Sequence, residues 1–327
     1  MKIRTLQVEN LRNLANVSLK PHPDFNFVLG ENGAGKTSIL EALFVLSRGR
    51  SFRTTTTQEL LGPRSIHFTV FAETEKDNGS IIRLGLERSG KHWKARKNSH
   101  DLARISDLTR SLPLVLMEPN SHLLISGPPE FRRKYLDSGV FHVEQQFVET
   151  WNRYFKALKQ RNSALKQGQI DVLDSIDEII VPLGECLDKS RKTFAGRVSQ
   201  GVSRILAKLN PCMEEIKLEY KGGWGEGSLK QALQKSREKD LDRGASNVGP
   251  HRMDLVITKG NSLARSILSR GEQKLVSASL LLAQAELLAD LGEKPIILLD
   301  DLYSEFDQCH YQSVLSAARD NGCLLYT

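Results

Sequence analysis

The sequence lacks long hydrophobic runs, and it has few cysteines. No apolar run approaches the ~20 residues that a helix needs to cross a bilayer, so we predict no transmembrane segment. Residues 1–4 lead directly into an alternating strand pattern, which gives no indication of a signal peptide. The cysteines form no C-x-x-C pair, which argues against a zinc site and a disulfide framework; they are Cys186, Cys212, Cys309 and Cys323. We therefore expect reduced thiols, a cytoplasmic location and no membrane partner.

The length and composition are those of a soluble globular protein. The chain has 327 residues, of which 39% are hydrophobic and 26% charged, enough for one large domain or two ordinary ones. It contains no internal repeat and no low-complexity tract. The net charge of +7 makes a polyanion such as nucleic acid a candidate partner, although charge alone does not identify one.

A phosphate-binding motif stands near the start of the chain. Residues 30–37 match G-x-x-x-x-G-K-[ST], with a strand pattern before them and an amphipathic helix pattern after them. The glycines allow a tight turn whose N–H groups point inward, and the helix N-terminus adds partial positive charge. A glycine-rich turn with a chance Lys-Thr pair is the plainer alternative. The motif predicts a site for a nucleoside triphosphate and Mg²⁺ formed by Gly30, Glu31, Asn32, Gly33, Ala34, Gly35, Lys36, Thr37 and Ser38.

Within this motif Lys36 is expected to reach the β- and γ-phosphates, and the Thr37 hydroxyl to take a Mg²⁺ position. A second motif, at residues 296–301, has the form of a Walker B strand: four large aliphatic residues are followed by two aspartates. Asp300 is predicted to hold Mg²⁺ together with Thr37, and Asp301 to orient or deprotonate the attacking water. Read alone, two acids after a strand are an ordinary polar loop.

Residues 268–273, Leu-Ser-Arg-Gly-Glu-Gln, resemble the L-S-G-G-Q signature of ABC-type ATPases. In that superfamily the signature faces the γ-phosphate bound by a second protomer, so the resemblance implies an ATP-dependent homodimer with Ser269 and Gly271 at the nucleotide. Arg270 and Glu272 depart from the pattern. Alone, the segment could be the cap of a helix. Residues 304–307 stand where the superfamily has its D-loop.

The order of these patterns predicts the α/β class, as an ABC-type P-loop ATPase head with an inserted, mostly helical subdomain. We expect a first head segment at 1–125 with antiparallel hairpins between 66 and 97, a helical insertion at 126–245, and a second head segment at 246–327. Long helices are predicted over 143–167, 170–208 and 273–291.

Several less common strings resemble the RecF family of bacterial recombination-mediator ATPases, within the SMC-like group. The opening strand ends in Val-Glu-Asn-Leu-Arg-Asn at residues 8–13, and the resemblance implies that Arg12 and Asn13 contact nucleotide. The other strings lie at residues 46–53, 125–137, 154–162 and 249–255. The insertion is also too short for an SMC coiled-coil arm.

The resemblance implies a protein of recombinational repair and replication restart that binds ATP and DNA, preferably where a single-stranded gap meets duplex. It also implies weak DNA-stimulated ATPase activity and cooperation with RecR and RecO in loading RecA. Candidate DNA contacts are cationic residues, with Trp93 among them: Arg50, Arg53, Lys91, Lys94, Arg96, Lys97, Arg132, Arg133, Lys156, Lys159 and Arg161. His251 and Arg252 are either structural or close to nucleotide or DNA.

Two departures qualify these expectations. No glutamine stands where a Q-loop is expected, and Glu118-Pro119 occupies that region. The chain stops at Thr327, at best the first residue of the switch that follows this strand in ABC-type heads, so we expect a truncated chain with impaired hydrolysis. Asp301, one methylene shorter than the usual Glu, agrees with slow chemistry. The alternatives are a transporter ATPase subunit and an ATP-binding module without hydrolysis.

Overall fold

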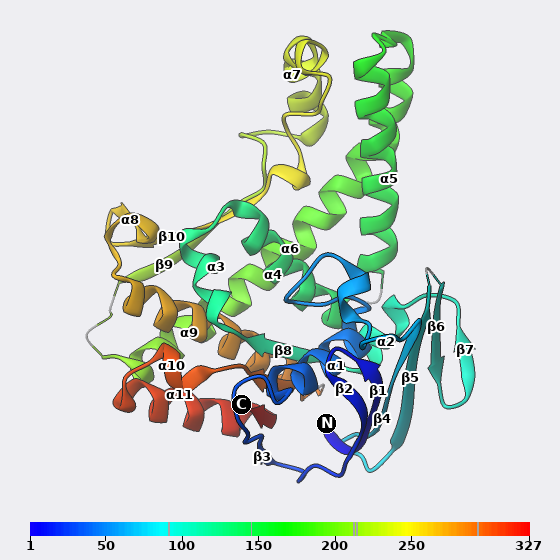
Figure 1. Ribbon diagram of the computed structural model, residues 1–327. Helices are drawn as coiled ribbons and strands as arrows, with labels where there is room; N and C mark the ends of the chain where they lie inside the picture. The colour runs from blue at the N-terminus through cyan, green and yellow to red at the C-terminus, as the bar shows by residue number, and fades with distance from the viewer. Residues whose placement is uncertain (91, 145, 212, 214, 293) are drawn as a thin grey trace. The chain divides into compact units, whose positions relative to one another are not determined.

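The structure is a computed structural model that describes residues 1–327 except 91, 145, 212, 214 and 293, with only the backbone of Cys323 and Leu324 (Figure 1). The chain forms two compact units. Unit 1 consists of Met1–Ser121, Arg204–Pro211 and Lys274–Thr327, and unit 2 of His122–Ser203 and Cys212–Gln273. Residues 246–273 thus fold with unit 2. The functional division into 1–125, 126–245 and 246–327 stays a prediction.

Unit 1 contains a six-stranded antiparallel sheet with the order β2-β1-β4-β5-β6-β7. Side chains of β5 alternate between buried and exposed, as a sheet with one covered face requires. The predicted hairpins are confirmed: β4 pairs with β5 and β5 with β6, all antiparallel. The strands are β1 (Lys2–Leu11), β2 (Leu14–Leu19), β4 (His67–Glu75), β5 (Ile81–Ser89), β6 (His92–Lys97) and β7 (His100–Leu102).

A second sheet of unit 1 is parallel and has the order β3-β13-β12-β8. All four residues of β12 are buried, which explains its unbroken aliphatic sequence. Leu299 is in register with both Met117 and Tyr326, so the residues that follow these three strands meet at one edge. The strands are β3 (Phe25–Phe27), β8 (Leu114–Met117), β12 (Ile296–Leu299) and β13 (Cys323–Tyr326).

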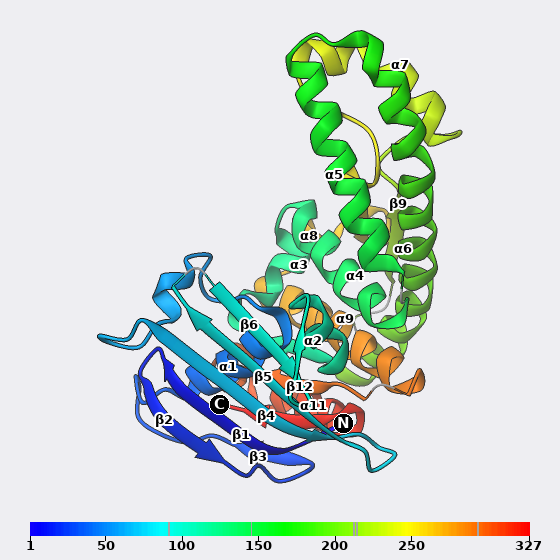
Figure 2. The same cartoon turned by 90° about the vertical axis from the view of Figure 1, so that its right-hand side faces the viewer.

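Helix α1 (Lys36–Arg48) lies between the two sheets of unit 1 (Figure 2). One hydrophobic core joins its Leu40 and Leu43 to Leu6 of the antiparallel sheet and Ile296 of the parallel sheet. This packing holds the start of α1 beside the carboxyl edge of the parallel strands. The other helical elements of unit 1 are η1 (Thr57–Leu60), α2 (Ser106–Ser111), α10 (Leu302–Glu305) and α11 (Gln308–Asn321); η2 (Pro119–His122) ends at the unit boundary, and α9 (Arg270–Asp290) begins in unit 2.

Unit 2 is mostly helical, as predicted for the insertion, with a small antiparallel sheet β11-β10-β9. Helix α7 was not predicted, although Ser228 caps its start and Gly244, with φ of 61°, ends it. No helix in the described part of the chain is both long and apolar enough to cross a membrane. The elements are α3 (Leu123–Ser126), α4 (Pro129–Val143), α5 (Phe147–Lys166), η3 (Ile170–Val172), α6 (Leu173–Leu209), whose last residues belong to unit 1, β9 (Ile216–Lys221), α7 (Leu229–Arg243), η4 (Pro250–Arg252), β10 (Asp254–Lys259), β11 (Ser262–Leu263) and α8 (Ala264–Ile267).

Two arginines predicted as DNA contacts are instead buried in unit 2. Arg161 is fully buried and donates to Asp177 at 2.7 Å and to Asp240 at 2.6 Å. Arg132 is also buried and forms a two-bond pair with Asp254 at 2.7 and 3.1 Å. The prediction was wrong for both, because their charges are neutralised inside the protein and are not available to phosphates. Lys91, another candidate, lies outside the described residues.

Two neighbours in unit 2 fix the tautomer of the His251 ring. Its Nε2 lies 3.0 Å from the Ser246 carbonyl oxygen and its Nδ1 lies 2.8 Å from the Tyr154 hydroxyl. Because a carbonyl only accepts, Nε2 carries the proton and Nδ1 accepts from Tyr154. Both ring nitrogens are therefore used within the protein, which favours the structural interpretation of His251.

We expect His251 to make the stability of the chain depend on pH. Burial lowers its pKa to about 4, whereas an unfolded histidine titrates near ~6.5. Between these two pH values the unfolded state binds one more proton at His251 than the folded state. The stability that the neutral, buried His251 contributes is therefore complete above about pH 6.5 and is lost as the pH falls toward 4. The loss amounts to about 3 kcal/mol at most.

The measurement is urea unfolding at pH 7, 6 and 5. His251→Gln should be less stable than the wild type at pH 7 but should lose less stability on acidification. The control His92→Gln changes an exposed histidine and should follow the wild-type pH dependence. Equal pH slopes for His251→Gln and the wild type would contradict the prediction.

Candidate nucleotide-binding site

The loop at residues 30–37 has the backbone that its glycines predict. Gly33 and Gly35 have φ of 81° and 101°, in the left-handed region that glycine adopts without strain. A Cβ on Gly35 would also lie 2.8 Å from a methyl carbon of Leu14, too close to be accommodated without movement. Helix α1 begins directly after Gly35, so its free N–H groups face the loop.

The Lys36 side chain folds back over this loop. Its Nζ donates to the carbonyl oxygens of Gly30 at 2.7 Å and Glu31 at 3.1 Å. Its positive charge therefore lies within the turn, beside the N-terminal end of α1. The charge of the Lys36 ammonium and the partial positive charge of the helix N-terminus therefore add at the same place, as an anion site requires.

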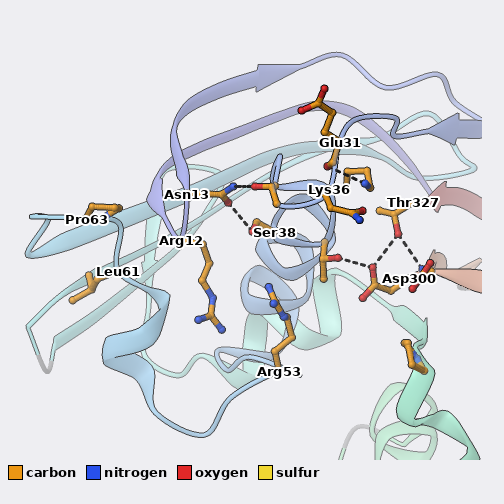
Figure 3. A pocket seen from close by; sticks show the side chains of 16 residues that line it. Arg12, Asn13, Glu31, Lys36, Ser38, Arg53, Leu61, Pro63, Asp300 and Thr327 are labelled. Atoms are coloured by element: carbon orange, nitrogen blue, oxygen red, sulfur yellow. Dashed lines mark hydrogen bonds between the residues drawn. The ribbon is translucent and has the colours of Figure 1, made fainter.

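Thr37 and Asp300, predicted as a metal pair, are brought together. Although 263 residues separate them, Thr37 Oγ1 donates to Asp300 Oδ1 at 2.9 Å. The hydroxyl of Thr327 donates to the same carboxylate oxygen at 2.9 Å (Figure 3) and accepts from the Asp301 N–H at 3.1 Å. Thr327 therefore fixes the backbone that carries both acids. Asp301 itself is exposed and has φ of 53°.

The turn between β1 and β2 is fastened to the same loop. Asn13 donates from Nδ2 to the Gly33 carbonyl at 2.8 Å, and its Oδ1 accepts from the Ser38 hydroxyl at 3.0 Å. The preceding residue, Arg12, has φ of 55°. These bonds explain how two residues distant from the loop in sequence reach its pocket.

These groups line one pocket of about 710 Å³, formed by unit 1 alone. Most of the predicted residues line it, but Gly30, Ala34, Ser269 and Gly271 are absent from its lining. Sequence reasoning did not assign Leu61, Pro63 or Pro119 to this site, and it placed Arg53 with DNA. The lining consists of Arg12, Asn13, Glu31, Asn32, Gly33, Gly35, Lys36, Thr37, Ser38, Arg53, Leu61, Pro63, Pro119, Asp300, Asp301 and Thr327.

Glu118 follows β8 where a Q-loop residue was sought. Burial, with a further contribution from the nearby charge of Asp300, raises the pKa of Glu118 to about 7. The Asp300 N–H donates at 2.9 Å to the carbonyl oxygen of Met117, the residue before Glu118. Strand pairing thus explains why two carboxyl groups that are far apart in sequence influence each other.

The signature segment belongs to unit 2 and caps α9. The Ser269 hydroxyl accepts from the Glu272 N–H at 3.3 Å, and the Glu272 carboxylate accepts from the Ser269 N–H at 2.8 Å. This reciprocal pair is a capping box. Glu272, which departs from the signature, therefore has a structural role. Gly271 is exposed, and a Cβ added to it would meet open space.

Comparison of the sequence with known proteins shows the family to which the chain belongs. A sequence model described as the RecF/RecN/SMC N terminal domain matches residues 2–322. The DNA replication and repair protein RecF of Stenotrophomonas maltophilia (strain R551-3) is 42% identical over 96% of this chain and 89% of its own length. That of Marinomonas sp. (strain MWYL1) is 35% identical over 96% and 86%. The chain belongs to the RecF family.

Solved structures agree with this RecF assignment. The recombination mediator protein RecF-ATP in the RecFOR pathway superimposes with a TM-score of 0.90 at 26% identity, covering 100% of this chain and 91% of that one. The Smc head domain of Pyrococcus furiosus, at 16% identity and a TM-score of 0.57, shares the fold. The predicted fold class is confirmed, and the chain is a DNA replication and repair protein of the RecF type. A transporter subunit is not favoured.

Proposed function

We propose that this RecF-type chain binds ATP with Mg²⁺ in the pocket of unit 1. The observation that carries the proposal is the meeting of Thr37 and Asp300 at the mouth of the loop held by Lys36. Lys36 and the start of α1 would bind the phosphates, while Arg12 and Asn13 would approach the nucleotide from the turn between β1 and β2. The structural neighbour described as RecF-ATP supports this choice of ligand.

The oxygen donors fit Mg²⁺. A Thr hydroxyl and an Asp carboxylate are hard ligands, and Mg²⁺ bound to nucleotides takes one or two protein groups besides phosphates and water. No cluster of three or more His, Cys, Asp or Glu residues suited to a metal occurs in the described part of the chain. When bound, Mg²⁺ would neutralise phosphate charge. Asp301, which follows Asp300 and is exposed, would orient or deprotonate water in a slow hydrolysis.

We further infer an ATP-dependent homodimer in which Ser269 and Gly271 of one protomer face the nucleotide of the other. The capping box fixes Ser269 at the start of α9, and the open space at Gly271 allows a phosphate to approach. Such a dimer would bind gapped DNA in the cytoplasm and act with RecR, RecO and RecA. The structural neighbour is described as RecF in the RecFOR pathway, which supports RecR and RecO among these partners.

Gly271→Glu should separate dimerisation from ATP binding. The new side chain meets open space within the chain, but in a dimer it would place a carboxylate against the triphosphate. We expect the variant to bind ATP like the wild type and to dimerise at least about tenfold more weakly, since like charges at an interface cost several kcal/mol. The matched control is Gly196→Glu, because Gly196 is an exposed glycine that also faces open space.

The measurement is analytical sedimentation with and without ATP and gapped DNA. The wild type and Gly196→Glu should become dimers when ATP and gapped DNA are added, and Gly271→Glu should remain a monomer. A Gly271→Glu dimer of wild-type strength would exclude the signature from the interface. A wild-type chain that stays monomeric with ATP on gapped DNA would overturn the dimer itself.

A further inference from the structure

Glu41 is a fully buried carboxylate on α1 to which the motifs give no role. It accepts two hydrogen bonds from Arg12, from Nε at 3.0 Å and from Nη2 at 2.9 Å. It also accepts from the Ser51 hydroxyl, and Nη1 of Arg53 lies 3.6 Å away, beyond hydrogen-bond distance. One buried acid thus gathers two guanidinium groups, and both arginines line the nucleotide pocket.

The same carboxylate shapes the segment that follows α1. The Ser51 hydroxyl, which donates to Glu41, accepts from the N–H groups of Arg53 at 2.8 Å and Thr54 at 3.1 Å. The direction of the chain at residues 51–54 is therefore set from Glu41. Arg12 comes from the turn between β1 and β2, so two distant segments share one anchor.

The charges around Glu41 are not balanced inside the protein. Its single negative charge faces the two positive charges of Arg12 and Arg53. A further acid, Glu59, lies 4.0 Å from Arg12 Nη1, but its side chain is 53% exposed, so water screens its charge. A buried acid with one arginine would be a neutral pair. With the second arginine, positive charge remains at the wall of the pocket.

We propose that Glu41 is a positioning residue for the nucleotide site: it holds Arg12 by one edge and places Arg53 through Ser51, so that both guanidinium groups present positive charge to a nucleoside triphosphate. Arg12 is 20% and Arg53 46% exposed, so each keeps donors directed away from Glu41. The bond to Glu41 also raises the pKa of Arg12, which therefore stays charged. This inference rests on the proposed ATP site.

The test is a thermodynamic cycle measured with a fluorescent ATP analogue. Glu41→Gln keeps the shape of the side chain but loses the charge-assisted bonds, and it should weaken binding about tenfold. Arg12→Gln should weaken it by a similar factor. The double variant should bind only about threefold more weakly than Arg12→Gln, because the part of the Glu41 effect that acts through Arg12 is already lost and only the part through Ser51 and Arg53 remains. A residue that only supports the fold would give additive losses.

Glu59→Gln is the matched control, since Glu59 is the more distant, exposed acid beside Arg12; it should bind within about twofold of the wild type. Unchanged or tighter binding by Glu41→Gln would overturn the proposal, since the carboxylate would then only offset positive charge. A wild-type chain that does not bind the analogue would overturn the ATP site as well.

If Glu41→Gln does not fold, Ser51→Ala tests the proposal in its place. It should weaken binding about threefold, because the hydroxyl that joins Glu41 to the Arg53 N–H is lost while the Arg53 side chain itself remains. Combining it with Arg53→Gln should add nothing to the loss caused by Arg53→Gln alone. Additive losses, or no loss in Ser51→Ala, would overturn the role of this segment.

Discussion

Arg161→Leu should destabilise unit 2 by about 3–5 kcal/mol, a large part of the ~5–15 kcal/mol that a folded domain has. The substitution removes the buried guanidinium from two carboxylates: among the described residues, Asp177 keeps only Arg237, at 3.5 Å, and Asp240 keeps only uncharged donors. Asp240 has a fully buried side chain, and that of Asp177 is only 10% exposed. Arg161 also donates to the Ser246 hydroxyl at 2.8 Å. The guanidinium therefore joins α5, α6 and α7, and its loss affects all three helices.

This effect is measured by urea unfolding of the full chain, with limited proteolysis to locate the loosened unit. Lys159→Ala, two positions away on α5 and exposed, is the control and should stay within about 0.5 kcal/mol of the wild type. The triple variant Arg161→Leu, Asp177→Asn, Asp240→Asn should recover part of the loss, because no uncompensated charge remains buried. A single variant as stable as the wild type would contradict the prediction.

Lys36→Ala should weaken ATP binding at least about a hundredfold, since each hydrogen bond to a charged group is worth about 1.5–3 kcal/mol. Lys36 Nζ already lies inside the turn that the phosphates would enter. The substitution removes a flexible cation and leaves the glycine backbone intact, so the fold should be unchanged. ATP-dependent dimerisation should disappear together with binding.

Isothermal titration with ATP and Mg²⁺ measures this loss. Lys20→Ala, an exposed lysine of the same unit, should bind like the wild type. Retained affinity in Lys36→Ala would mean that the loop is not the phosphate site. Steady-state turnover with DNA gives a second result: wild-type activity that Lys36→Ala abolishes would contradict the expectation of impaired hydrolysis.

The parts of the site that could be predicted are those with local causes. Residues 30–37 need glycine where φ is positive, and a strand buried on both faces needs unbroken aliphatic residues, so each leaves its pattern in a short stretch. Pairing Thr37 with Asp300 needed a known motif, since 263 residues separate them.

The buried pairs could not be predicted in this way. Arg132 and Asp254 are 122 residues apart, Arg161 and Asp240 are 79 apart, and no short pattern distinguishes a buried arginine from an exposed one. Helix α7 was missed because it buries only Leu229, Leu233 and Asp240, which is too few for an apolar period. The capping residues Ser228 and Gly244 were the signal in the sequence that could have indicated this helix.

The left-handed backbone at Asp301 offers a stabilising substitution that would damage the site. A non-glycine residue in this region costs of order 1 kcal/mol, and Asp301 has φ of 53°. Because the Asp301 side chain is exposed, Asp301→Gly is a natural choice for a more stable chain. It would also remove a carboxylate from the pocket. A variant selected only for its melting temperature would gain stability at the expense of the nucleotide site.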